Sequence, residues 1–386
     1  MGGGLMQLVA YGAQDIYLTG NPQITFFKVV YRRHTNFSME AIEQTWNGTS
    51  NATGRCTATI SRNGDLVHRM YIEITLGTTP VTAFDNPGAG FINTVELEIG
   101  GQKIDKHSGH WMENWAELTE PNPTGVVSND SNGDGTLFQK MSGMGGVEGG
   151  GGDAGDKIFV PLQFWFCRNP GLALPLIALQ YHEVKIILDH QMTAITSNNG
   201  DVNNQLWCDY IYLDTDERRR FAQVSHEYLI EQVQEQSITT GTGTKDLNFN
   251  HPVKELIWSL STSKTGHNSV TAAIGTGTFQ LKLNGHDRFA ARDFRYFSRT
   301  QVWEHHSGAG GLKGDTAGAG RFDDSIGVYS FALKPEEHQP SGTCNFSRID
   351  NAQLVCGAGS AADTIFAVNY NVLRIMSGMG GLAYSN

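Results

Sequence analysis

Residues 96–105 read ELEIGGQKID, and residues 280–289 read QLKLNGHDRF, about 184 residues further along the chain. In both stretches apolar residues alternate with polar ones, a Gly-Gly or Asn-Gly pair follows, and a second short run ends the unit. Alternation with a period of two is typical of a strand with one buried face, and the glycine-containing pair is typical of a tight hairpin turn. The chain therefore contains one strand–turn–strand unit twice.

The surroundings of the two units repeat as well. Upstream, residues 68–74 read HRMYIEI and residues 251–257 read HPVKELI, and an aromatic stretch follows each unit downstream. Solenoid modules repeat every 20–50 residues or so, whereas this repeat is much longer and has the size of a whole domain. A chain of 386 residues also suits two domains better than one. We therefore predict two similarly folded β domains in tandem.

Turn signals and strand patterns give the predicted domain boundaries. Residues 1–23 are predicted to form an N-terminal arm, and the β-branched and aromatic run ITFFKVVY at 24–31 is predicted to be the first strand. Residues 24–213 are then the first β domain, 214–224 a linker helix capped by Asp214, 225–376 the second β domain and 377–386 a C-terminal tail. Further strands are predicted over residues 57–62, 69–76, 92–99, 158–167, 182–189, 206–213, 226–234, 254–261, 278–283, 299–304, 326–333 and 364–375.

Two glycine-rich segments interrupt the strand pattern, at residues 118–157 and 307–324. We expect both to be exposed loops without regular structure, because a long structureless segment does not fit inside a core. Sheets with one apolar face bury those faces best by packing against each other. The predicted fold class is therefore all-β, with two tandem antiparallel β-sandwich jelly rolls and short helices in the linker and loops.

Composition excludes several classes of function. The formal net charge of −11 disfavours direct contact with nucleic acid, which requires clustered Lys and Arg. The five cysteines are odd in number and widely spaced, so free thiols and a reducing compartment are expected. No secretory signal and no run of roughly 20 apolar residues is visible, so a soluble protein made in the cytosol is expected.

Clusters of metal-ligand residues occur, but their spacing is wrong for a site. His305 and His306, with His286 and Asp287 nearby, would point to opposite faces of a strand, so loop histidines at a strand end are the better interpretation. The run HSGHWMENW, which carries His107, His110 and Glu113, lacks the spacing of HExxH and is better explained by packing of its Trp residues on a domain end. No phosphate-binding glycine motif and no nucleophile elbow is present. We predict no catalytic, cofactor or metal site, and no enzyme.

Segments rich in aromatic residues and Arg have the composition of interface hot spots. The same segments would also fit ordinary strand ends whose Arg side chains extend into water. The candidate inter-subunit contacts are Tyr31, Arg32, Arg33, Arg295, Tyr296 and Arg299. Sequons for N-glycosylation, most of them chance matches in a cytosolic protein, occur at Asn36, Asn47, Asn51, Asn129 and Asn345.

Five long segments together resemble the major capsid protein family of nucleocytoplasmic large DNA viruses. They cover almost the whole chain and are far more specific than any short motif. The segments are LVAYGAQDIYLTGNPQITFFKVVYRRHTNF (8–37), YIYLDTDERRRFAQVSHEYLIEQVQ (210–234), NGHDRFAARDFRYF (284–297), YSFALKPEEHQPSGTCNFSRIDNAQL (329–354) and NYNVLRIMSGMGGLAYSN (369–386).

The resemblance implies two jelly rolls per chain, and a homotrimer whose six sandwiches form a pseudo-hexagonal capsomer. Such capsomers tile an icosahedral virion shell over an inner membrane, and the chain is synthesised and assembled in the host cytoplasm. Residues 118–157 and 307–324 would be outward loops, and residues 1–23 would contact neighbours or proteins below. The implied partners are neighbouring capsomers, minor capsid and penton proteins and the inner membrane layer, without direct nucleic acid contact.

Two alternatives remain open at this point. A minor capsid paralogue of the same shell would differ in copy number per particle, which quantitative mass spectrometry of virions measures. A carbohydrate-binding β-sandwich would need an exposed aromatic platform or a carboxylate pair in a cleft, and would give hits on a glycan array.

Overall fold

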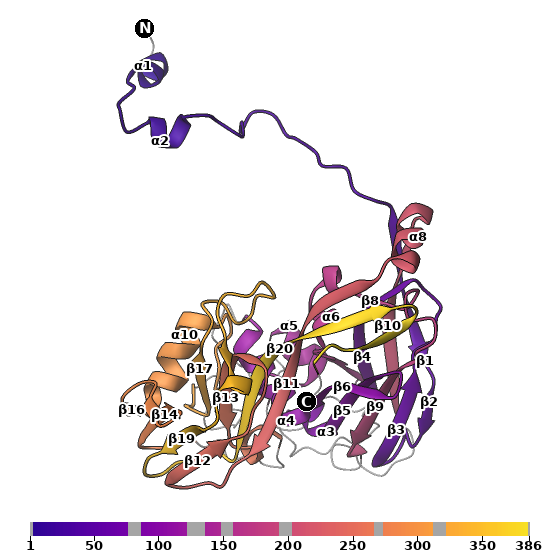
Figure 1. Cartoon of the computed structure of the whole chain (residues 1–386), viewed down its shortest axis with the longest axis vertical. Coiled ribbons are helices and arrows are strands. Elements are labelled where there is room, and N and C mark those ends of the chain that lie inside the picture. The colour runs from indigo at the N-terminus through magenta and orange to yellow at the C-terminus, as the bar shows by residue number, and fades with distance from the viewer. Residues whose placement is uncertain are drawn as a thin grey trace. The chain divides into compact units, whose positions relative to one another are not determined.

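The computed structural model describes residues 3–75, 86–121, 136–147, 157–192, 203–265, 273–311 and 322–384. They divide into two units, Met1–Asn36 and Phe37–Asn386 (Figure 1). The first unit contains the short helices α1 (Gly3–Val9) and α2 (Ile16–Thr19), followed by an extended segment.

The strand expected at residues 24–31 does not form. Phe26 and Phe27 are 87% and 98% exposed, and the first strand of the chain, β1, begins only at Phe37. The run ITFFKVVY has strand-forming residues but pairs with no strand among the described residues. Strand propensity depends on having a partner strand and a face to bury, so composition alone was misleading here.

The first jelly roll spans residues 37–213 and consists of two antiparallel sheets. Its first sheet has the order β1 (Phe37–Gln44), β10 (Asn203–Leu213), β4 (Leu66–Thr75), β7 (Lys157–Pro161), and β8 (Leu174–Pro175) also pairs with β4. Its second sheet has the order β2 (Trp46–Gly48), β3 (Gly54–Thr59), β9 (Val184–His190), β5 (Ile92–Ile99), β6 (Gln102–Ser108).

The second jelly roll spans residues 226–382 and repeats this arrangement. Its first sheet has the order β11 (His226–Ser237), β20 (Thr364–Met376), β13 (Pro252–Ser259), β17 (Ile326–Ser330), with β18 (Cys344–Asn345) and β21 (Met379–Leu382) at its edges. Its second sheet has the order β12 (Gly243–Leu247), β19 (Ala352–Cys356), β14 (Thr278–Leu283), β15 (His286–Asp287), with β16 (Arg292–Asp293) pairing with β14.

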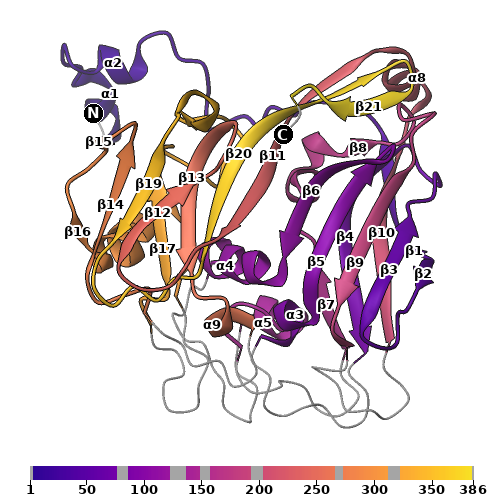
Figure 2. The same ribbon diagram turned by 60° about the horizontal axis from the view of Figure 1, so that its bottom comes forward.

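The strand orders of the first sheets correspond, with β1, β10, β4 and β7 matching β11, β20, β13 and β17. The repeated unit of the sequence is a hairpin in both copies, β5–β6 and β14–β15. Both central turn residues have positive φ, 59° and 84° at Gly100 and Gly101, and 50° and 79° at Asn284 and Gly285. This is the conformation that a two-residue hairpin turn requires. The predicted tandem of jelly rolls is confirmed (Figure 2).

Helices occupy several places where the sequence predicted something else. The run 299–304 is not a strand but part of the helices η2 (Tyr296–Thr300) and α10 (Gln301–His305), and residues 158–167 end in helix α6 (Trp165–Arg168). Part of the expected loop at 118–157 is helix α5 (Leu137–Ser142). The other helices of the two jelly rolls, within the described residues, are α3 (Pro87–Phe91), α4 (Gly109–Thr119), η1 (Pro170–Leu172), α8 (Thr215–Gln223), α9 (Thr262–Thr265) and η3 (Phe346–Arg348).

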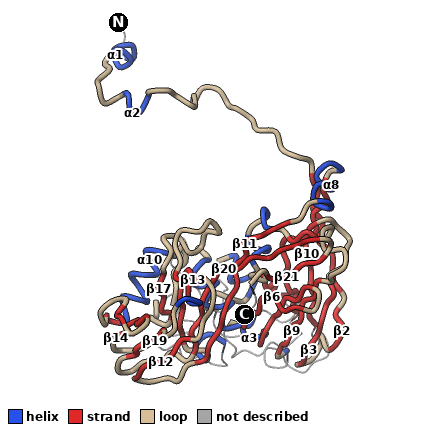
Figure 3. Tube along the Cα trace, viewed as in Figure 1, coloured by secondary structure: helices blue, strands red, loops and turns tan. Residues whose placement is uncertain are grey.

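The linker helix agrees with its prediction, because Asp214 Oδ1 accepts a hydrogen bond from Thr215 N at 2.8 Å at the start of α8. Strands make up most of both jelly rolls, with the helices lying at their ends and between them (Figure 3). Within the described ranges, no helix is both long and apolar enough to cross a membrane.

The main hydrophobic cluster includes residues from both jelly rolls. Trp111 and Ile72 of the first jelly roll belong to the same cluster as Ile257, Val328 and Phe366 of the second. A separate cluster, which includes Trp258 and Phe279, fills the interior of the second jelly roll. The two sandwiches therefore share one continuous core, and their contact is as buried as the interior of a domain.

Candidate functional site

The contact between the jelly rolls is organised around helix α4. Ser108 caps the helix by accepting a hydrogen bond from Trp111 N at 3.2 Å. A side chain at Gly109 would collide with the carbonyl oxygen of Ala89, since a Cβ atom there would lie only 2.1 Å away. Residue 109 must therefore be glycine for the helix to begin here. All residues of α4 from Gly109 to Leu118 are buried.

One side of α4 makes hydrogen bonds to strand β13 of the second jelly roll. His110 Nε2 lies 2.6 Å from Ser259 Oγ, and Asn114 Nδ2 donates to the same oxygen at 2.8 Å. Burial lowers the pKa of His110 to about 3, so this imidazole is neutral. The ring of Trp111 lies 5.4 Å from that of Phe366 on β20. The Trp residues of this run are packed as predicted, but they lie in the contact between the jelly rolls rather than on a domain end, and the helix α4 that carries them was not predicted.

A buried ion pair joins the end of α4 to the second jelly roll. Lys264 Nζ lies 2.9 Å from both carboxylate oxygens of Glu117 and donates to Ser325 Oγ at 3.0 Å. Glu113, one turn earlier, accepts hydrogen bonds from the backbone N–H groups of Gly145 and Gly146. Burial and the nearby Glu117 raise the pKa of Glu113 well above its usual range. The Glu113 carboxyl group therefore holds a backbone loop in place.

A second set of charges surrounds Glu231 on β11. Arg168 of the first jelly roll lies 2.9 Å from Glu231 Oε2, and Lys254 lies 2.8 Å from Oε1. Burial alone would raise the pKa of Glu231, but His338 and these two cations lower it to about 2. The Arg168 guanidinium also stacks on Trp115 of α4, 4.4 Å from the ring centroid. One carboxylate thus connects both jelly rolls.

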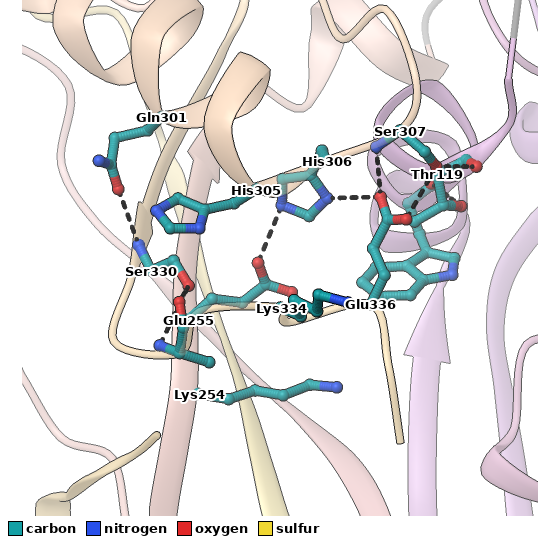
Figure 4. Close-up of polar contacts among 12 residues, drawn as sticks. Thr119, Lys254, Glu255, Gln301, His305, His306, Ser307, Ser330, Lys334 and Glu336 are labelled. Carbon is teal, nitrogen blue, oxygen red and sulfur yellow. Dashed lines mark hydrogen bonds and ion pairs between the residues drawn. The ribbon is translucent and has the colours of Figure 1, made fainter. Parts of the chain in front are cut away.

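A third set centres on His306, which follows α10 (Figure 4). Its fully buried ring lies between two carboxylates, with Nε2 2.9 Å from Glu255 Oε2 and Nδ1 3.0 Å from Glu336 Oε1. Ser307 Oγ lies within 2.8 Å of Glu336 and 2.9 Å from the carbonyl oxygen of Thr119, at the end of α4. Burial alone would lower the pKa of His306, but the two carboxylates raise it to about 9.

The protonated state of His306 makes stability depend on pH. Because its folded-state pKa of about 9 exceeds the ordinary value of 6.5, the stabilisation is fully present below about pH 6.5 and is lost as pH rises through about 9. We expect wild type to exceed His306→Gln in free energy of unfolding by on the order of 2–3 kcal/mol at pH 6.5, and by much less at pH 9.5. Denaturant titrations at the two pH values measure this. A constant difference would contradict the assignment.

The other residues that the sequence marked as potential metal ligands do not come together in one place. His305 Nδ1 lies 3.2 Å from the carbonyl oxygen of Leu333, and His286 and Asp287 are exposed in β15. No group of three or more potential metal ligands occurs in the part of the chain that the structure describes. The arrangement of charges at the contact is structural, since each buried carboxylate is matched by a cation or by backbone donors.

The candidate interface residues lie in two places. Tyr31, Arg32 and Arg33 are exposed in the first unit. The other three lie around η2, where Arg299 binds Asp324 at 2.6 Å and Arg295 is exposed. Tyr296 is partly covered by the guanidinium of Arg292, 3.8 Å from its ring centroid. Of the sequons, Asn36, Asn47, Asn51 and Asn345 are exposed, and Asn129 lies outside the described residues.

Comparisons with known proteins agree with this architecture. A family model described as "Major capsid protein N-terminus" matches residues 25–214, and one described as "Large eukaryotic DNA virus major capsid protein" matches residues 217–381. The chain is 52% identical over 404 residues to the major capsid protein of Pyramimonas orientalis virus, and 40% identical over 463 residues to that of Paramecium bursaria Chlorella virus 1, with all of each chain covered.

Solved structures show the same likeness. A chain of the PBCV-1 virus capsid superimposes with a TM-score of 0.77 at 36% identity, covering 94% of this chain and 100% of that one. The Faustovirus major capsid protein shares the fold, with a TM-score of 0.66 at 14% identity over 95% of this chain and 94% of that one. The chain therefore belongs to the major capsid proteins of large eukaryotic DNA viruses, a family of structural rather than enzymatic proteins that form the icosahedral capsid shell.

Proposed function

We propose that three copies of the chain form a homotrimer, in which six jelly rolls make a pseudo-hexagonal capsomer. The observation that carries the proposal is the shared core, together with the buried ion pairs that join two sandwiches of the same strand order. Because the two sandwiches are fixed relative to each other, one chain behaves as a rigid pair of similar subunits. Three such pairs around a threefold axis imitate sixfold symmetry and close on themselves.

The mass of the protein in solution tests whether it forms a trimer. Light scattering or native mass spectrometry of the purified full chain is expected to give three times the chain mass of 42.2 kDa. The mass should stay constant over a wide range of protein concentration, because a closed ring neither grows nor leaves free contact surfaces. A chain that remains monomeric at every concentration, or forms open-ended polymers, would refute the proposal.

The proposed partners are neighbouring capsomers, minor capsid and penton proteins and an inner membrane layer, with assembly in the host cytoplasm. The first unit supports the role of an arm, since it exposes large apolar side chains such as Phe26, Phe27 and Tyr31 beside Arg32 and Arg33. Exposed aromatic and Arg side chains are typical of residues that become buried in an interface. The exposed sequons are sites where sugars could be attached without disturbing the core.

A further inference from the structure

Two carboxyl groups lie one turn apart on the buried helix α4. Glu113 is fully buried, and the side chain of Glu117 is 1% exposed. The two carboxyl groups are hydrogen-bonded to each other. An ionised carboxylate only accepts hydrogen bonds, so this bond can form only when one of the two carboxyl groups carries a proton. Ionising both members of such a pair is costly, because the two like charges repel each other.

The charges in contact with the pair favour one shared proton. The ammonium group of Lys264 lies 2.9 Å from both oxygens of Glu117. Glu113 Oε1 instead accepts hydrogen bonds from the backbone N–H groups of Gly145 at 2.9 Å and Gly146 at 2.8 Å. With both carboxyl groups ionised, the buried site would hold two negative charges and one positive charge. With one proton between the carboxyl groups, the site is neutral.

The elements packed around the pair supply no second cation. Among the described residues, the charged groups that act on Glu113 are Glu117 on its own helix and Lys264 on α9. His110, one turn earlier on α4, is neutral, because burial lowers its pKa to about 3. Neither the segment 143–147, which follows α5, nor helix α3 contains an ionisable side chain. A second negative charge at this place would therefore stay unbalanced.

The pair belongs to a closed chain of contacts that runs through both jelly rolls. Val147, at the end of the segment 143–147, donates its N–H to Asn86 Oδ1 at 2.7 Å. Asn86 Nδ2 donates to the carbonyl oxygen of Lys264 at 3.2 Å, and the Lys264 side chain leads back to Glu117 on α4. Helix α9, which carries Lys264, packs against both α4 and α3 (Figure 2). A change of charge at either carboxyl group thus reaches the segment 143–147 and the contact between the jelly rolls.

We propose that Glu113 and Glu117 share one proton, and that this proton keeps a pH-sensitive clamp closed between the two jelly rolls. When the proton passes to water, the buried site gains one unbalanced negative charge. The charge is stabilised only if the site opens to water, which releases the N–H groups of Gly145 and Gly146 and loosens the contact around Lys264. The clamp acts within one chain, so it does not depend on the proposed trimer.

The direction of the pH dependence follows from the position of the proton. Burial and the neighbouring Glu117 raise the pKa of Glu113 well above the ordinary value of 4.5. Because the folded-state pKa is the higher one, the stabilisation is fully present below about pH 4.5 and is lost as pH rises through the folded-state pKa. The clamp is therefore expected to hold in acid and to open toward alkaline pH.

Glu113→Gln tests the clamp, because its amide has the shape of a protonated carboxyl group and stays neutral at every pH. The amide oxygen still accepts from Gly145 and Gly146, and the amide NH2 donates to Glu117. Relative to this variant, the folding equilibrium constant of wild type is expected to fall roughly tenfold per pH unit, from about pH 5 up to the folded-state pKa. Denaturant titrations between about pH 5.5 and about pH 8.5, at one protein concentration, measure this ratio. His306 titrates in both chains and cancels. A ratio that does not change with pH would overturn the proposal.

Hydrogen exchange and two further variants complete the test. At about pH 8.5 the amides of residues 143–147 should exchange at least tenfold faster in wild type than in Glu113→Gln, and at about pH 5.5 equally fast. Equal rates at both pH values would overturn the proposal. Glu227→Gln, which removes an exposed carboxylate paired with Arg374 at 2.8 Å, is the control and should show a constant ratio to wild type. If Glu113→Gln does not fold by circular dichroism, Glu117→Gln removes the excess carboxyl group from the other side and should abolish the pH dependence equally. A pH dependence that persists in that variant would contradict the shared proton.

Discussion

Replacing Lys264 with methionine is expected to lower the free energy of unfolding by roughly 3–5 kcal/mol. The ammonium group is fully buried and lies 2.9 Å from both oxygens of Glu117, whose side chain is 1% exposed. Methionine fills a similar volume but removes the buried cation from beside the Glu117 carboxylate, in a site that also holds Glu113. An uncompensated buried charge is far more costly than the loss of an exposed ion pair.

The matched control for this variant is Lys282→Met, which removes an exposed ion pair with Asp287 at 3.7 Å. It should change the free energy of unfolding by less than about 0.5 kcal/mol. Adding Glu117→Leu to Lys264→Met should restore part of the loss, because an apolar pair then replaces the buried carboxylate. Denaturant titrations at neutral pH measure all three variants. A Lys264→Met chain as stable as the Lys282→Met control would show that the pair does not hold the jelly rolls together.

Trp111→Ala is expected to lower the free energy of unfolding by about 3–5 kcal/mol, as large-to-small changes at fully buried aromatic positions do. The ring is 0% exposed, lies 5.3 Å from Trp115 and 5.4 Å from Phe366, and belongs to the cluster shared by both jelly rolls. Its loss leaves a cavity at the contact between the sandwiches rather than inside one of them. We therefore expect both jelly rolls to unfold at a lower temperature and in one transition.

Calorimetry at a fixed protein concentration measures this effect, since association adds to the apparent stability of an oligomer. Tyr384→Ala, which removes an exposed ring, is the control and should leave the transition temperature almost unchanged. Two separate transitions in the Trp111→Ala chain, with only one of them shifted, would mean that the jelly rolls fold independently. That result would contradict a shared core.

The repeated hairpin was predictable because its signals are local. Alternation and a glycine-containing pair specify strands and a tight turn without reference to the rest of the chain, and β5 and β14 have the bounds that the pattern indicated, 92–99 and 278–283. The α8 helix was predictable for the same reason, since the residues that signal its start, the cap and the acidic first turn, lie within four positions. At residues 24–31, by contrast, a strand would need a distant partner strand, and the local pattern alone predicted one that does not form.

The hexapeptide MSGMGG shows this limit directly, because it occurs twice with different structures. At 141–146 it ends helix α5 and turns its glycine N–H groups toward the buried Glu113. At 376–381 it forms the hairpin between β20 and β21, with positive φ at Ser377 and Gly378. Glycine permits both conformations, so tertiary contacts select between them.

The contact between the jelly rolls was not predictable in its details. Glu117 and Lys264 are separated by 147 positions, and nothing in the residues around either indicates the other. The histidine pair at 305–306 was expected in a loop at a strand end, but it lies at the end of a helix, and the His306 side chain is buried. Such networks form only where two folded sandwiches pack against each other. The local sequence pattern gives no information about that packing.

A cryo-EM map of the assembled full-length protein tests the central claim most directly. The rigid pairing of two like sandwiches predicts a trimer with six sandwiches around one axis. A particle with any other number of chains, or with the two sandwiches of one chain separated from each other, would contradict it.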